Sequence, residues 1–111
     1  MASSVVLHAR LTLLATADGG RTTPLPKRVM ALVDIGTTFR GQPVCCDARV
    51  TLQGTEQLEP GGSCDVVLEP LCEDLWDDVV TGSSFTIHEG RAKRGEGVVL
   101  ARLEPKRALV Q

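Results

Sequence analysis

Aromatic side chains are scarce in this chain of 111 residues, at 3% of the sequence, with two phenylalanines, one tryptophan and no tyrosine. Proteins that bind single-stranded nucleic acid without sequence preference stack the bases on aromatic rings. The composition therefore argues against that class of protein. The core must be built from valine, leucine, isoleucine and alanine, and a chain of this length can bury one modest core without a metal or a disulfide.

An excess of positive charge is also missing. The formal net charge is -2 and the sequence pI is about 5.6, so no overall field attracts the protein to phosphate backbones. The charges are nevertheless segregated, because residues 56–78 hold eight carboxylates and no lysine or arginine, whereas residues 91–107 hold six basic residues. Any contact with nucleic acid must therefore be local.

Long apolar runs are absent. No stretch reaches the roughly 18 apolar residues of a membrane span, and the apolar segment near the N-terminus is interrupted by His8 and Arg10. That segment also lacks the basic region that precedes the apolar part of a signal peptide. We expect a cytoplasmic protein that makes no contact with a membrane.

The motifs of common catalytic and metal sites are missing too. The chain has no phosphate-binding Gly-x-x-x-x-Gly-Lys-Ser/Thr loop, no strand-linked Gly-x-Gly-x-x-Gly and no His-Glu-x-x-His. Its four cysteines form no Cys-x-x-Cys pair, which argues against a zinc ribbon or a redox motif. We predict no catalytic residue, no metal, no cofactor and no bound nucleotide.

What the sequence does contain is alternation of apolar and polar residues, which predicts strands. The pattern is clearest over residues 4–14, and further strands are expected over 29–35, 44–52, 64–68, 85–88 and 97–103. Residues 21–26 are expected to form a loop without a regular ladder, because prolines lack the backbone donor. Residues 70–81 are expected to form an acidic loop with at most one helical turn.

About six short strands can bury a shared apolar face only by curling into a barrel or stacking as a sandwich. We expect an all-β protein and favour a single small closed barrel of antiparallel strands. The domain is expected to span residues 1–111, with its core at about 4–104 and a short tail at 105–111.

The best candidate for a binding surface is the glycine-rich segment 89–97. It carries three cations, and its backbone amides are free to reach phosphate oxygens. The alternative is a charged hairpin loop that serves only solubility.

Two motifs lie at opposite ends of the chain. The first is Asp18-Gly19-Gly20-Arg21-Thr22-Thr23-Pro24-Leu25, and the second is Gly82-Ser83-Ser84-Phe85-Thr86-Ile87-His88-Glu89-Gly90-Arg91 followed by Gly95-Glu96-Gly97-Val98-Val99. Both resemble motifs of the C-terminal β-barrel (domain III) of bacterial elongation factor Tu. Between them, Glu59-Pro60-Gly61 is similar to the family's Met-Pro-Gly turn. The resemblance covers roughly residues 4–104 and implies a free-standing relative of this barrel.

In that family the barrel does no chemistry; it packs against a GTPase domain and a second barrel and offers a surface to aminoacyl-tRNA. The 111 residues contain neither of those other domains, so we expect no GTP-driven cycle in them. Carried over position by position, the resemblance implies an RNA- or partner-binding site at two loops. Its members are Arg21, Thr22, Thr23, Glu89, Gly90 and Arg91, joined by Lys93 and Arg94 of the same loop.

Within this site, Glu89 matches the glutamate that contacts tRNA in the family, and Gly90 matches the loop glycine. Arg91 aligns less directly, since the family has two glycines before its arginine. Thr22 replaces the family's histidine. The family's Lys-Gly-Tyr-Arg-Pro-Gln-Phe segment, part of its RNA-facing surface, is replaced here by residues 27–33 without tyrosine or glutamine.

The acidic loop is a second candidate surface, for a protein partner. It consists of Glu73, Asp74, Trp76 and Asp77. The tryptophan suits a partner surface but equally the core of a small barrel.

The sequence thus supports two hypotheses about function, in addition to the expected fold. The first is a non-catalytic binding module that contacts aminoacyl-tRNA or a translation-associated protein. The alternative is a scaffold or regulatory protein-interaction domain that kept the barrel and lost RNA binding. An enzyme is the least expected outcome, because no catalytic constellation is present.

Overall fold

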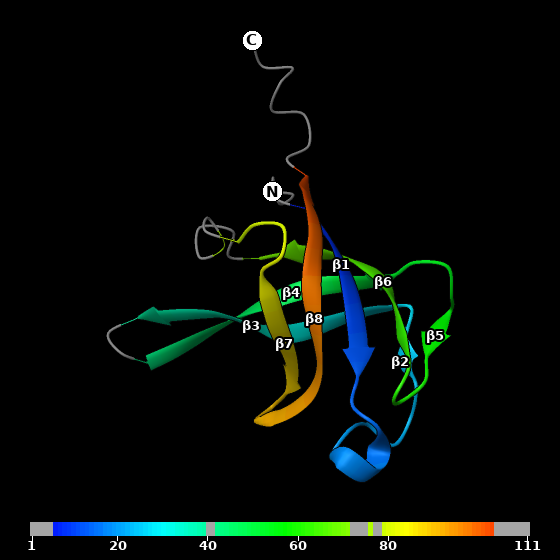
Figure 1. Ribbon diagram of the computed structural model, residues 1–111. Helices are drawn as coiled ribbons and strands as arrows, with labels where there is room; N and C mark the ends of the chain where they lie inside the picture. Colours follow the sequence, from blue (N-terminus) through cyan, green and yellow to red (C-terminus); the bar gives the residue numbers. More distant parts are fainter. Residues whose placement is uncertain (1–5, 40–41, 72–75, 77–78, 104–111) are drawn as a thin grey trace.

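The computed structural model describes residues 6–39, 42–71, 76 and 79–103. Six antiparallel strands close a barrel in the order β1-β6-β4-β3-β7-β8 (Figure 1). The strands are β1 (Val6–Leu13), β3 (Arg28–Phe39), β4 (Gln42–Leu52), β6 (Ser63–Pro70), β7 (Ser84–Glu89) and β8 (Ala92–Leu103). The all-β class and the closed barrel are confirmed.

The core fills the barrel with small aliphatic side chains, as the alternation predicted. In β1 the buried positions are Leu7, Ala9, Leu11 and Leu13. In β4 they are Cys46, Ala48, Val50 and Leu52, opposite β6 residues such as Val66 and Leu68. Among the described residues no polar or charged residue is buried as a whole.

The β3–β4 hairpin is longer than expected and extends beyond the barrel wall (Figure 1). Strand β3 pairs with β7 only over residues 32–34, so its later residues pair with β4 alone. The register of β3 against β4 shifts between Asp34 and Thr38. Within this shift Gly36 has φ 85° and donates its backbone N–H to Asp34 Oδ1 at 2.8 Å.

Two expectations about loops are wrong. Residues 92–96, expected to belong to a loop, form the first part of β8, and only the turn at Gly90 and Arg91 separates it from β7. Residues 25–26, expected to lie outside any ladder, form β2 (Leu25–Pro26), which pairs with β5 (Gln57–Leu58) in a small second sheet. Proline is tolerated there because the sheet has only edge strands.

Trp76 lies in the core with its side chain fully buried. Arg102 near the end of β8 donates to the carbonyl oxygens of Trp76 and Val79, at 2.6 and 2.8 Å. The core interpretation of Trp76 is therefore correct, and its side chain does not belong to a partner surface. The other expected members of that surface, Glu73, Asp74 and Asp77, lie outside the described residues, as does the expected tail 105–111.

The described part of the chain contains no helix that is long and apolar enough to cross a membrane.

Candidate nucleic-acid interface

The two loops singled out in the sequence lie at the same end of the barrel. One follows β1 and the short 3-10 helix η1 (Thr16–Asp18), and the other is the β7–β8 turn (Figure 1). A backbone hydrogen bond holds the second loop against the end of β1, because Leu14 donates its N–H to the carbonyl of Arg94 at 2.9 Å. We call residues 19–24 and 89–94 together the junction surface.

At the centre of the junction surface, one carboxylate holds two guanidinium groups. Glu89 accepts a hydrogen bond from Arg21 Nη1, and its other oxygen lies 3.2 Å from Arg94 Nε. The three residues form what we call the Arg21–Glu89–Arg94 cluster. It joins positions 68 residues apart in the sequence, and charge-assisted contacts of this kind are stronger than neutral hydrogen bonds.

The two arginines also bind backbone carbonyls of the first loop. Arg94 Nη1 donates to Gly19 O at 2.7 Å and to Gly20 O at 3.1 Å. Arg21 Nε donates to Thr23 O at 3.1 Å. Their side chains are 17% exposed for Arg21 and 29% for Arg94. The cluster therefore fixes the shape of the first loop, and these two cations are largely committed to it.

Other members of the expected site face solvent. Thr22, Thr23, Gly90, Arg91 and Lys93 are exposed. Lys93 pairs with Glu96, with Nζ and Oε2 2.9 Å apart. The side chain of Arg91 makes no hydrogen bond or ion pair with any residue that the structure describes. Arg91 is thus the cation of this surface that is most available to a ligand.

Glycines shape both halves of the surface. Gly20 is buried, and a Cβ there would collide with the backbone of Leu14, so a larger residue cannot close the first loop. Gly90 has φ 62°, and a Cβ there would have no atom within 4 Å. The backbone of the β7–β8 turn therefore stands open to an approaching group.

The structure thus brings all eight expected site residues to one end of the barrel, where they fall into two groups. Arg21, Glu89 and Arg94 bind one another, whereas Thr22, Thr23, Gly90, Arg91 and Lys93 face outward. Sequence reasoning missed the carbonyls of Gly19 and Gly20 as partners of Arg94. No sequence signal could have found them, because contacts between a side chain and a distant backbone leave no local pattern.

We predict that Glu89→Gln lowers the free energy of unfolding by about 1 kcal/mol, because two neighbouring guanidinium groups then lack the charge between them. Urea denaturation measures this change. Glu96→Gln is the matched control, since Glu96 pairs with Lys93 at a more exposed site (Glu96 is 59% exposed), and its expected effect is below about 0.5 kcal/mol. Equal effects of the two variants would show that the cluster does not hold the loops.

Candidate metal ligands do not gather in the part of the chain that the structure describes. No group of three or more histidine, cysteine, aspartate or glutamate residues is placed to hold an ion there. Cys45 and Cys64 are free thiols.

The chain matches no known protein-family model, and no curated protein shows significant similarity to it.

Proposed function

We propose that this barrel is a non-catalytic, cytoplasmic binding module that contacts the backbone of tRNA through the junction surface. The observation that carries the proposal is the meeting of the two loops at one end of the barrel, tied by the Arg21–Glu89–Arg94 cluster. The resemblance to the C-terminal barrel of elongation factor Tu supports it, because the same two loops carry the matching motifs.

The local charge of the junction surface supports a phosphate ligand. Its residues include four cations against the single carboxylate of Glu89, although the whole chain has a formal net charge of -2. Contacts from arginine, lysine and backbone N–H groups to phosphates position a protein on nucleic acid without reading sequence. We therefore assign this surface to contacts with the RNA backbone and not to the recognition of bases.

We assign the exposed residues to contacts with the RNA, and the Arg21–Glu89–Arg94 cluster to holding the two loops together. Arg91, which has no side-chain partner among the described residues, makes the main phosphate contact, and Lys93 lies two residues further along the chain. The hydroxyls of Thr22 and Thr23 and the open backbone at Gly90 offer hydrogen bonds to phosphate or ribose. Glu89 holds Arg21 and Arg94 in place. The resemblance implies a direct RNA contact for this residue, which is a different role.

Binding of fluorescently labelled aminoacylated and deacylated tRNA, followed by anisotropy, tests this function. Affinity should fall steeply between about 50 and 200 mM salt, because each phosphate contact releases counterions. Arg91→Glu should weaken binding at low salt about tenfold and reduce the magnitude of the salt slope by about one. The control is Arg49→Glu, at an exposed position in the middle of β4.

Two results would count against the proposal. Absence of tRNA binding at low salt would favour the alternative, a scaffold or regulatory domain that kept the barrel without the RNA contact. Equal effects of Arg91→Glu and Arg49→Glu would show that any binding does not pass through the junction surface. Arg94→Glu is unsuitable for this test, because Arg94 binds the carbonyls of Gly19 and Gly20 and its loss would alter the loop itself.

A further inference from the structure

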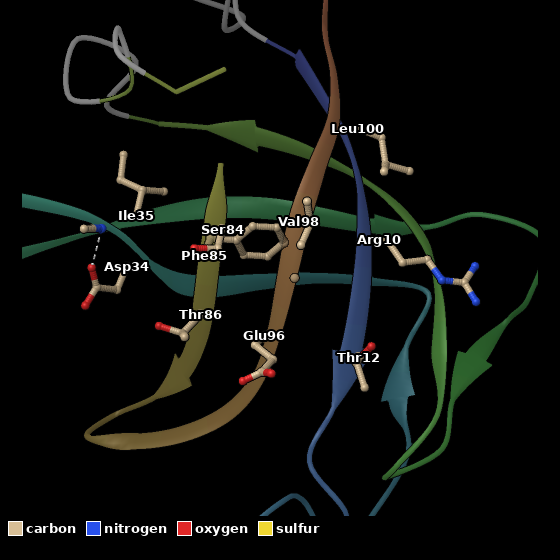
Figure 2. A pocket seen from close by; sticks show the side chains of 12 residues that line it. Arg10, Thr12, Asp34, Ile35, Ser84, Phe85, Thr86, Glu96, Val98 and Leu100 are labelled. Carbon is tan, nitrogen blue, oxygen red and sulfur yellow. Dashed lines mark hydrogen bonds between the residues drawn. The ribbon is translucent and has the colours of Figure 1, made fainter. Parts of the chain in front are cut away.

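A pocket of about 840 Å³ lies on the barrel wall, lined by residues of β1, β3, β7 and β8 (Figure 2). These four strands are neighbours in the barrel, in the order β3-β7-β8-β1. One side of the pocket is formed by β3 at Asp34, Ile35 and Gly36, where the β3–β4 hairpin begins to leave the barrel. Its lining residues differ entirely from those of the junction surface.

Apolar side chains lie open in this pocket. Val98 and Leu100 on β8 are each 43% exposed, and Ile35 on β3, which also lines the pocket, is half-buried (Figure 2). Single exposed aliphatic residues are common on protein surfaces. Several of them within one depression mark a place where a partner can bury an apolar group.

The charge of the pocket is negative. Asp34 and Glu96 both line it. Glu96 is neutralised by Lys93 at 2.9 Å, and Arg10, the cation in the lining, is engaged by Asp65 outside it at 3.1 Å. Asp34 accepts the N–H of Gly36 but has no cationic partner among the described residues. Asp34 is therefore a carboxylate whose charge is left uncompensated beside apolar surface.

The neighbourhood of Asp34 reflects this charge. The thiol of Cys45, paired with Asp34 across β3 and β4, has its pKa raised by partial burial and then by the negative charge of Asp34. The Cys45 thiol thus lies close enough to Asp34 to be affected by its charge. A phosphate-bearing ligand would be repelled from the same place.

We propose that this pocket docks a segment of a partner protein that presents a large apolar side chain next to a lysine or arginine. The apolar side chain covers Val98, Leu100 and Ile35, and the cation pairs with Asp34. Nucleic acid does not fit, because the uncompensated charge is negative. This inference does not depend on tRNA binding, since the two surfaces share no residue.

The test uses the full chain as target for a phage library of short random peptides, from which enriched peptides are resynthesised for affinity measurements. Enriched sequences should pair leucine, isoleucine, methionine or phenylalanine with a nearby lysine or arginine. Asp34→Asn and Val98→Ser should each weaken their binding about fivefold, through the lost ion pair and the lost apolar contact respectively.

Matched controls lie outside the pocket. Asp47→Asn removes an exposed carboxylate of β4, and Met30→Ser removes an apolar side chain of β3 that is 48% exposed; neither should change peptide affinity. Arg91→Glu should also leave it unchanged, which separates this proposal from the function proposed for the junction surface. Circular dichroism and thermal unfolding verify that each variant is folded.

Three outcomes would overturn the proposal. The first is that no peptide is enriched. The second is that enriched peptides lack the basic residue or bind Asp34→Asn and Val98→Ser as tightly as the unchanged protein. The third is concentration-dependent dimerisation in sedimentation experiments that Val98→Ser abolishes, because the occupant of the pocket would then be a second copy of this chain.

Discussion

Replacing Trp76 with alanine is expected to lower the free energy of unfolding by about 3 to 5 kcal/mol, the usual cost of deleting a buried large aromatic side chain. Trp76 is fully buried, and it belongs to a core made otherwise of small aliphatic residues and Phe85. Neighbouring side chains of that size cannot refill the cavity. Urea denaturation followed by far-ultraviolet circular dichroism measures the loss without needing the tryptophan as a probe.

Trp76→Phe is the matched control. The indole Nε1 is buried and has no hydrogen-bond partner in the described structure, so phenylalanine removes an unsatisfied donor while keeping most of the ring. Its expected cost is below about 1.5 kcal/mol. If alanine and phenylalanine cost the same small amount, Trp76 is not a core residue and the expectation of a partner surface in the acidic loop returns.

Gly97→Ala is expected to cost about 2 to 3 kcal/mol, as overpacking in a barrel wall does. A Cβ at Gly97 would lie 2.5 Å from the carbonyl oxygen of Arg10 and would overlap the ring of Phe85. Gly97 pairs with Phe85 across β7 and β8, so the ring packs where the glycine has no side chain. Thermal or urea unfolding measures the effect.

Two variants place this effect at the contact with Phe85. Val98→Ala, on the next and exposed position of β8, should change stability by less than about 0.5 kcal/mol. Combined with Phe85→Leu, Gly97→Ala should cost less than it does alone, because one of its two collisions is removed. Additive costs would show that the ring and the glycine are not in contact.

The sequence predicted the barrel well where strands alternate cleanly. In β1 and β4 one face is aliphatic and the other polar, and the burial follows that pattern residue by residue. The first part of β8 was missed because Gly95 and the charged residues around it were taken as a loop, and the strand was expected to begin only at Gly97. Both glycines are inward positions of the strand, where a Cβ would approach Thr12 O and Arg10 O too closely, so they are required by packing and not by a turn.

The sequence identified the residues of the candidate site but not how they contact one another. The two motifs identified the loops, and nothing in the spacing showed that Glu89 lies between Arg21 and Arg94. Salt bridges between loops distant in sequence depend on how the strands close the barrel. The pocket on the wall was likewise invisible, because Asp34, Val98 and Leu100 come together only through the order β3-β7-β8.

The most direct test of the central claim is a ¹H–¹⁵N correlation spectrum of the labelled protein titrated with tRNA at low salt. We expect the perturbed amides to cluster in residues 19–24 and 89–94, with Arg91 among the largest changes, and Arg91→Glu to need about tenfold more tRNA for the same perturbations. Perturbations centred on the pocket wall at Ser84, Val98 and Leu100 with none at the junction surface, or a spectrum unchanged by tRNA, would contradict it.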